Sequence, residues 1–239
     1  MSGPSLERPA SRVIVVADGD LPSRAALDAA WPGWDAGADR IVAADGGAAA
    51  ALQLGLRPDL VIGDLDSIAP ADLQRVHALG IPVEARPRAK EESDTELALG
   101  AALGSGPAAV TILGALGGSR FDHALANVWL LALPGLAGYE VVLLDARCRV
   151  RLLRGPGRVA LRGPVGDLVS LLPFAGPAEG VSTEGLAYPL REEPLTAGPS
   201  RGLSNVRRQS EATVSLRSGA LLIVETHPIE THPPEEGAP

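Results

Sequence analysis

The chain has 239 residues, 46% of them apolar, and a formal net charge of −8. It is long enough to bury one large core or two small ones, and its acidic balance argues against a nucleic-acid partner. No stretch is long and apolar enough to predict a membrane span, and the single cysteine, Cys148, excludes an internal disulfide framework and fits the reducing cytoplasm.

Up to about residue 147, short apolar runs alternate with segments rich in alanine and leucine. Five runs lack polar alternation, as strands buried on both faces do: RVIVVAD, RIVAAD, DLVIGD, AAVTILGA and YEVVLLD. The segments between them have helical spacing with glycine at or near their ends: GGAAAALQLG, ADLQRVHALG, SDTELALGAALG and FDHALANVWLLAL. We therefore predict an α/β domain over residues 12–147, with a mostly parallel, Rossmann-like sheet and flanking helices.

The pattern of apolar residues changes after residue 147. The runs become short, β-branched or alternating, and glycine and proline separate them, which is typical of an antiparallel sandwich: RVRLLR, GRVALRG, DLVSLLPF, GVSTEGLAYPL and EATVSLRSGALLIVET. We predict a smaller all-β sandwich domain over residues 148–227. The polar, proline-rich ends, residues 1–11 and 228–239, are expected to be flexible tails.

Aspartates follow several predicted strands or begin predicted helices in the first half. Ligands of open α/β sheets bind beyond the carboxyl ends of the strands, so these side chains are expected to share one crevice. Any one of them could instead be a helix cap or a turn former. The residues are Asp18, Asp45, Asp64, Asp66, Asp94 and Asp122.

Several carboxylates in one crevice repel each other unless cations neutralise them. An oxygen-only ligand set without a cysteine or histidine cluster favours Mg²⁺ over zinc. Mg²⁺ commonly shares its ligand shell with substrate phosphates, so the pattern predicts Mg²⁺-dependent phosphoryl chemistry.

Two pairs of glycines, Gly46–Gly47 and Gly117–Gly118, lie beside these aspartates. Paired glycines let backbone N–H groups approach phosphate closely, although they also form ordinary turns. The sequence contains neither the GxxxxGK[ST] phosphate loop nor the GxGxxG dinucleotide fingerprint. A bound nucleotide would therefore be held without either common device.

Several blocks resemble, in order and spacing, those of the thiamine pyrophosphokinase family. The similarity covers roughly residues 12–226, including the second-domain segment GDLVSLLPFAGPAEGVSTEGLAYPL. The other blocks are AADGGAAAALQLGLRPDLVIGDLDSI, KEESDTELAL, GALGGSRFDHALANVWLL and GLSNVRRQSEATVSLRSGALLIVET.

The resemblance implies that the chain moves the pyrophosphoryl group of ATP to the hydroxyl of thiamine, giving thiamine diphosphate and AMP. It implies an ATP- and Mg²⁺-binding catalytic domain over residues 12–147 and a thiamine-binding domain over residues 148–227. It also implies a homodimer with active sites at the subunit interface.

By position in the blocks, the resemblance implies that four aspartates bind Mg²⁺. Asp45 would lie beside the other three, and Gly46 and Gly47 would lie near the phosphates of ATP. Ser93 stands where the family usually has threonine, and it keeps the hydroxyl. The four metal candidates are Asp45, Asp64, Asp66 and Asp94.

The family's Arg-x-Asp-His element corresponds to Arg120, Asp122 and His123, although GGSRFDH carries one residue more than usual before it. Arg120 is expected to bind phosphate with its planar guanidinium, and Lys90 is a second candidate for that role. Asp94 and Asp122 both remain possible general bases.

His123 would be either a proton shuttle or a structural histidine, and Asn127 follows it by one helical turn. Ser204 and Asn205 match the Ser-Asn pair that is expected to face thiamine. An acidic residue often follows that pair in the family, whereas here Val206 and Arg207 follow.

Two other functions are weighed against this one. A related pyrophosphokinase that acts on a hydroxymethyl-pterin would keep the aspartates but should lack the second domain. A non-catalytic thiamine or nucleotide sensor would be expected to have lost at least one of the four metal candidates.

Overall fold

The computed structural model describes residues 11–227 of the chain. The chain divides into two compact units, Met1–Ala146 and Arg147–Pro239, which are treated one at a time. The predicted tails lie outside the described residues except for Ser11, whose hydroxyl donates to Asp39 at 3.0 Å.

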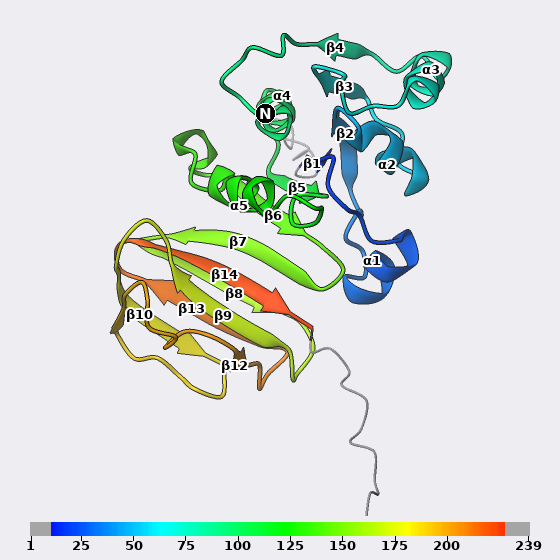
Figure 1. Ribbon diagram of the computed structural model, residues 1–239. Helices are drawn as coiled ribbons and strands as arrows, with labels where there is room; N and C mark the ends of the chain where they lie inside the picture. Colours follow the sequence, from blue (N-terminus) through cyan, green and yellow to red (C-terminus); the bar gives the residue numbers. More distant parts are fainter. Residues whose placement is uncertain (1–10, 228–239) are drawn as a thin grey trace, which may run out of the picture. The chain divides into compact units, whose positions relative to one another are not determined.

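The first unit is built on a parallel sheet of six strands, coloured blue to green in Figure 1. Each neighbouring pair within it is parallel, in the order β6-β5-β1-β2-β3-β4. Four consecutive residues of the central strand, 13–16, are fully buried, so both faces of the sheet are covered as predicted. The strands are β1 (Arg12–Val16), β2 (Ala38–Ala44), β3 (Leu60–Gly63), β4 (Val83–Ala85), β5 (Ala109–Leu113) and β6 (Glu140–Leu144).

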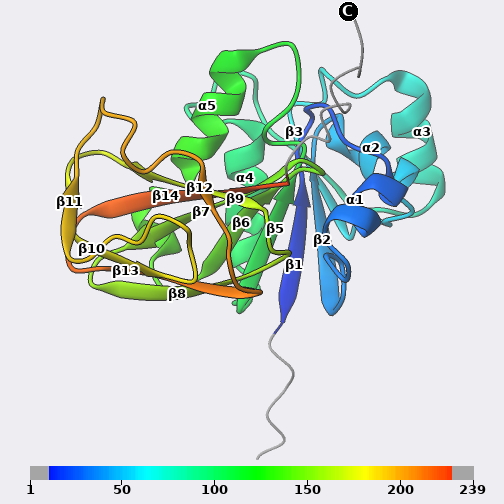
Figure 2. The same cartoon turned by 90° about the horizontal axis from the view of Figure 1, so that it is seen from below.

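Helices cover both faces of this sheet. Figures 1 and 2 show α1, α2 and α3 on one side, and α4 and α5 on the other. On the first side Ile14 and Val16 pack in one apolar cluster with Leu27 of α1 and Ala51 of α2. The helices are α1 (Arg24–Ala30), α2 (Gly47–Gln53), α3 (Pro70–Ala78), α4 (Asp94–Leu103), α5 (Phe121–Leu130) and the 3₁₀ turn η1 (Pro134–Leu136).

The direction of winding changes at β1. The chain runs outward through β2, β3 and β4 and then returns to place β5 on the other side of β1. The loops that follow β1 and β5 therefore leave neighbouring strands toward opposite faces of the sheet. Such a point of reversal is where open α/β sheets bind ligands.

The second unit consists of two antiparallel sheets, with strand orders β12-β9-β14-β7 and β11-β10-β13-β8. Buried residues from both sheets form one apolar core, including Leu161, Leu171, Val214 and Ile223. The strands are β7 (Cys148–Arg154), β8 (Gly157–Arg162), β9 (Leu168–Pro173), β10 (Ala178–Glu184), β11 (Glu193–Leu195), β12 (Asn205–Val206), β13 (Glu211–Leu216) and β14 (Ala220–Thr226).

The predicted fold class, an α/β unit followed by a smaller β-sandwich, is confirmed. Within residues 11–227, no helix is long and apolar enough to cross a membrane.

Candidate active site

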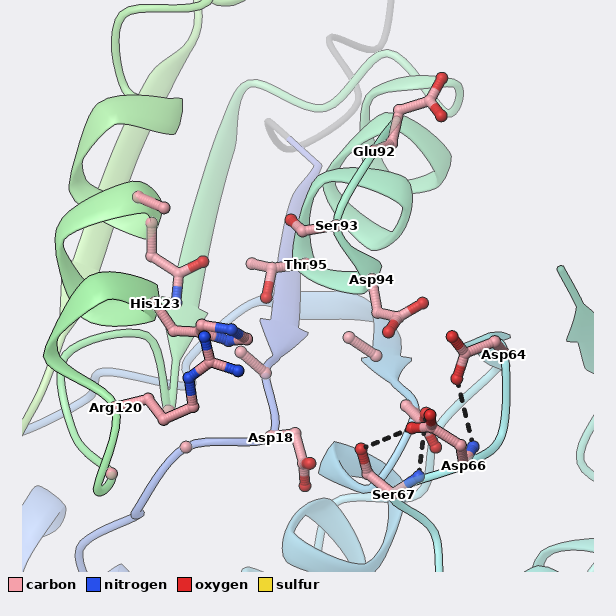
Figure 3. Close-up of a pocket in the computed structure, with 18 of the residues that line it drawn as sticks. Asp18, Asp64, Asp66, Ser67, Glu92, Ser93, Asp94, Thr95, Arg120 and His123 are labelled. Atoms are coloured by element: carbon pink, nitrogen blue, oxygen red, sulfur yellow. Dashed lines mark hydrogen bonds between the residues drawn. The ribbon is translucent and has the colours of Figure 1, made fainter. Parts of the chain in front are cut away.

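A cavity of about 660 Å³ opens at the carboxyl edge of the parallel sheet. Its walls come from the loops after β1, β2, β3 and β5, from the segment before α4 with the first turn of that helix, and from the first two turns of α5. Figure 3 shows this arrangement. The structure brings together eight of the predicted site residues in this lining: Asp45, Asp64, Asp66, Lys90, Asp94, Arg120, His123 and Asn127.

Asp45, which follows β2, is buried with only 1% of its surface exposed. Its two carboxylate oxygens accept backbone N–H groups of Ser67 at 3.3 Å and Ile68 at 3.1 Å. Burial raises the pKa of Asp45, and the nearby charges of Asp94 and Asp64 raise it further, whereas the two N–H donors act to lower it. Asp45 thus ties the loop after β3 to the end of β2.

The loop after β3 turns sharply at Leu65, whose φ is +64°. Such a backbone conformation is unusual for a bulky residue, and here it lies between the two aspartates of the Asp-Leu-Asp segment. The N–H of Asp66 donates to Oδ1 of Asp64 at 3.2 Å. One carboxylate oxygen from each of Asp45, Asp64 and Asp66 lies within 4.8 Å of the others, so three charges meet in a space suited to one cation.

Asp94 is the first residue of α4, where the helix dipole favours a negative charge. The hydroxyl of Ser93 caps this helix by accepting the N–H of Glu96 at 3.2 Å, so the exchange of threonine for serine leaves the cap intact. A Cβ added to Gly63 would lie 3.0 Å from Oδ1 of Asp94 and 3.0 Å from Cβ of Asp45. The carboxylate of Asp94 therefore stands over Gly63, next to Asp45.

The wall that faces these aspartates is formed by the start of α5, and Figure 3 shows Arg120 and His123 on it. Nε of Arg120 donates to Oδ1 of Asp122 at 3.2 Å, and this hydrogen bond together with the charge of Arg120 lowers the pKa of Asp122. Both side chains of that pair are 64% exposed, so the pair is weak enough to exchange for a ligand. Asp122 itself is not among the residues that line the cavity.

Asn127 anchors α5 to the site. Its amide donates to the carbonyl of Ala115, in the loop after β5, at 3.0 Å. Ser119, which directly precedes Arg120, also lines the cavity, as do Gly117 and Gly118. Arg120 follows Ser119 directly in this lining, and the expected insertion before it stays a prediction.

Several lining residues were not assigned a role from the sequence. Asp18 follows the central strand β1 and was noted only as one of the acidic residues at strand ends. Its position directly after β1, the strand at which the direction of winding reverses, is the feature that could have predicted its place in the site. Ser67, Arg88, Glu92 and Thr95 also line the cavity. Ser67, Glu92 and Thr95 fall within the quoted sequence blocks but were given no role there, and Arg88 lies outside those blocks.

Gly46 and Gly47 were expected to lack side chains so that phosphate could approach the backbone, but in the structure it is protein atoms that leave no room for a Cβ. A Cβ on Gly46 would lie 2.1 Å from Oδ1 of Asp18, and one on Gly47 would lie 2.3 Å from the carbonyl oxygen of Val16. Both glycines permit the start of α2 to pack closely against the end of β1. They are not among the lining residues, so their contact with phosphate stays a prediction.

The predicted Ser204–Asn205 pair lies in the second unit. Ser204 is exposed and has a φ of +55°, which turns the chain just before β12. Asn205 is buried, and its side-chain amide forms two hydrogen bonds with the backbone of Tyr188. Oδ1 accepts from the N–H of Tyr188 at 2.9 Å, and Nδ2 donates to its carbonyl oxygen at 2.7 Å. Tyr188 is 64% exposed, and Leu203, which comes two residues before Asn205, is 53% exposed. Asn205 therefore holds in place a segment that presents an aromatic side chain to solvent.

Two family models match the chain. The model described as "Thiamin pyrophosphokinase, catalytic domain" matches residues 34–143, and the model described as "Thiamin pyrophosphokinase, vitamin B1 binding domain" matches residues 158–221. The first match contains the cavity residues from Asp45 to Asn127, and the second contains Ser204 and Asn205.

Curated relatives give the same result. The chain is 27% identical over 186 residues to a thiamine pyrophosphokinase of Bacillus subtilis, covering 77% of this chain and 86% of that protein. It is 29% identical over 166 residues to thiamine pyrophosphokinase 2 of Oryza sativa, covering 66% of this chain and 61% of the relative. The crystal structure of the Bacillus subtilis enzyme superimposes with a TM-score of 0.79 at 25% identity, covering 92% of this chain and all of that one.

Proposed function

Because the chain belongs to the thiamine pyrophosphokinase family, we propose that it transfers the pyrophosphoryl group of ATP to the hydroxyl of thiamine, giving thiamine diphosphate and AMP. The observation that carries this proposal is the cavity itself, in which a wall of carboxylates faces a wall with Arg120 and His123. A polyphosphate fits between them if a divalent cation joins it to the acidic side. A reaction that consumes ATP also agrees with the cytoplasmic location expected from the sequence.

The acidic wall of the cavity, formed by Asp45, Asp64, Asp66 and Asp94, fits Mg²⁺. It offers only oxygen ligands, and its negative charge exceeds the positive charge of the side chains that pair with it. Asp45, Asp64, Asp66 and Asp94 would hold the ion. Oxygens of the first three lie within 4.8 Å of one another, and Asp45 also orients the loop through Ser67. The ion would supply neutralisation of phosphate charge and polarisation of the phosphorus under attack.

The chain's own residues would position the reacting groups, which is the main contribution of proteins to phosphoryl transfer. The thiamine hydroxyl oxygen forms a bond to the β-phosphorus, and the bond from that phosphorus to the oxygen shared with the α-phosphate breaks. The electron pair leaves on AMP, and the hydroxyl proton passes to a base. Arg120 would release Asp122 and form paired hydrogen bonds with phosphate oxygens.

Asp94 and Asp122 differ as candidates for that base. Asp94 lines the cavity, whereas Asp122 does not. The hydrogen bond from Arg120 also lowers the pKa of Asp122, so this carboxylate is a weaker base while the pair persists. Asp94 in turn accepts from Lys90 at 2.8 Å and would also bind the ion, so both carboxylates remain candidates for the base.

Ser204 and Tyr188 would contact thiamine, with Asn205 holding Tyr188 in place. We expect Ser204→Ala to raise the KM for thiamine about three- to tenfold with little change in kcat, because one hydrogen bond to the substrate is lost. Steady-state kinetics at saturating ATP measure this effect. Ser200→Ala, at another exposed serine of the same loop, is the matched control and should leave the KM unchanged. An unchanged KM in Ser204→Ala would remove Ser204 from the thiamine site.

The proposed enzyme is a homodimer with active sites at the subunit interface. Among the described residues of the first unit, four large apolar side chains are exposed, and three of them lie on α5: Phe121 at 77%, Leu125 at 39% and Trp129 at 58%. These residues are spaced four apart, so they form one stripe along the helix. A second copy of the chain would cover this stripe, next to Arg120 at the start of the same helix.

Trp129→Glu is therefore expected to shift the chain from dimer to monomer at micromolar concentration, because it places a charge in the proposed apolar contact. Sedimentation velocity measures the oligomeric state directly. Leu79→Glu changes the remaining exposed leucine of this unit, at the end of α3, and should not alter the mass. A Trp129→Glu protein that sediments like the unaltered chain would exclude α5 from the dimer contact.

The reaction is tested by incubating the purified protein with ATP, Mg²⁺ and either thiamine or a hydroxymethyl-pterin, and then measuring AMP. The proposal predicts AMP with thiamine only, and only when Mg²⁺ is present. AMP with the pterin alone would indicate the related pyrophosphokinase, and thiamine binding without AMP would indicate a sensor.

A further inference from the structure

Lys90, the single lysine of the chain, lies inside the acidic wall of the cavity. Its ammonium Nζ is 2.8 Å from Oδ1 of Asp94 and 3.5 Å from Oδ2 of Asp64. Its side chain is only 12% exposed. It is thus enclosed among carboxylates instead of extending toward solvent.

The two carboxylates that Lys90 joins are among those to which the proposed function assigns Mg²⁺. The oxygen of Asp94 that accepts from Lys90 is the same oxygen that stands over Gly63, close to Asp45. An ammonium between these oxygens occupies the space that a divalent ion bound to Asp64 and Asp94 would need. It also neutralises part of the negative charge that would attract the ion. The two cations cannot both sit close to the same oxygens without strong repulsion.

We propose that Lys90 is the resident counter-ion of the metal-free site and that the divalent ion displaces it on binding. In the metal-free protein Lys90 reduces the repulsion between Asp64 and Asp94. Once the ion binds, the freed ammonium faces the cavity where the polyphosphate is proposed to lie, and there it contacts phosphate. This inference rests on the proposed function for the identity of the ligand, but not for the exchange of cations.

The chemistry of lysine suits such an exchange. A compact ammonium on a flexible four-carbon stem can leave one pair of carboxylates and reach a new partner, whereas a guanidinium holds carboxylates through a rigid fork. The other cations of the chain are all arginines, including Arg88 on the same loop. Arg88 also contacts the acidic cluster, at 2.6 Å from Oδ2 of Asp66, but its side chain is 72% exposed.

The first test measures divalent-ion binding without nucleotide, using Mn²⁺ as the probe and the resonance of free Mn²⁺ as the signal. We expect Lys90→Met to bind Mn²⁺ about five- to tenfold more tightly than the unaltered protein, because the ion no longer has to displace an ammonium. Lys90→Arg should bind no more tightly than the unaltered protein. Arg86→Met removes the same charge from a neighbouring arginine that pairs with Glu84 outside the cavity lining, and it should change the affinity by less than about twofold.

These results separate displacement from the general effect of charge. If Arg86→Met tightens Mn²⁺ binding as much as Lys90→Met, or if Lys90→Met does not tighten it, the inference is wrong. The same Lys90→Met protein should raise the KM for ATP about fivefold or more, since a phosphate contact is lost. An ordinary structural ion pair would not produce these two effects in opposite directions.

The second test needs no substitution. Because Lys90 is the only lysine, protein labelled with ¹⁵N-lysine gives a single side-chain ammonium signal. We expect Mg²⁺ to move this signal toward the position of free lysine, over the same concentrations at which Mg²⁺ raises the melting temperature. A signal that stays in place while the protein binds Mg²⁺ would overturn the inference. The Mn²⁺ binding and the ammonium signal involve neither thiamine nor turnover, so a failure of either one is distinct from failure of the AMP assay.

Discussion

Asp66→Asn is expected to lower kcat by about 10³-fold or more, which corresponds to roughly 4 kcal/mol of lost transition-state stabilisation. Asp66 is 42% exposed, and its carboxylate accepts from the exposed Arg88 at 2.6 Å and from the hydroxyl of Ser67 at 3.2 Å. The substitution keeps the size of the side chain and removes the charge that the metal would bind. The loss should therefore arise from chemistry and not from unfolding.

The measurement is AMP release at saturating ATP and thiamine, with the melting temperature recorded for each protein. Asp72→Asn on α3 is the matched control, since Asp72 is outside the cavity lining and its substitution should preserve turnover. Near-normal turnover in Asp66→Asn would exclude Asp66 from the metal site.

The second large effect concerns stability. Glu225 on β14 is 1% exposed and accepts from three arginines at once: Arg207 at 2.7 Å, Arg149 at 2.8 Å and Arg151 at 3.2 Å. Glu225→Gln would leave these guanidinium groups without their shared carboxylate. We expect the free energy of unfolding to fall by about 3–5 kcal/mol, as is usual when one partner of a buried ion pair is removed.

Urea denaturation, followed by circular dichroism, measures this loss. Glu184→Gln provides the comparison, because Glu184 is 75% exposed and its ion pair with Arg158 is on the surface. That variant should lose less than about 1 kcal/mol. Equal losses in the two variants would mean that the buried network does not stabilise the second unit.

The same network explains a departure noted in the sequence. Arg207 stands two residues after Asn205, where the family often has an acidic residue nearby. Its guanidinium is fully buried against Glu225, and its backbone N–H donates to the carbonyl of Asp167 at 2.8 Å. The basic residue thus anchors the segment that carries Ser204 and does not face a ligand. Glu225→Gln should accordingly raise the KM for thiamine as well.

Much of the fold could be predicted because its signals are local. Unbroken apolar runs such as 13–16 identify strands covered on both faces, and the helical spacing of SDTELALGAALG identifies α4. The short strands β4, β11 and β12 were not predicted. They contain two or three residues each, too few for apolar alternation to appear.

The candidate site was predictable to the extent that its residues follow strands. Asp45, Asp64 and Asp66 could be brought together from sequence because parallel strands end at one edge of the sheet. The ion pair of Lys90 with Asp94 could not, because the loop before α4 has no periodic pattern from which its path can be read. Asn205 was likewise expected to face a ligand, whereas its amide is engaged by the backbone of Tyr188. Such contacts depend on the folded positions of segments distant in sequence.

The most direct measurement of the central claim follows the γ-phosphate of radiolabelled ATP after incubation with the protein, Mg²⁺ and thiamine. Transfer of an intact pyrophosphoryl group predicts that the label appears in thiamine diphosphate, in amounts equal to the AMP formed, and that chelating Mg²⁺ abolishes both. Label in thiamine monophosphate with ADP as the second product, or label released only as inorganic phosphate, would contradict the proposed reaction.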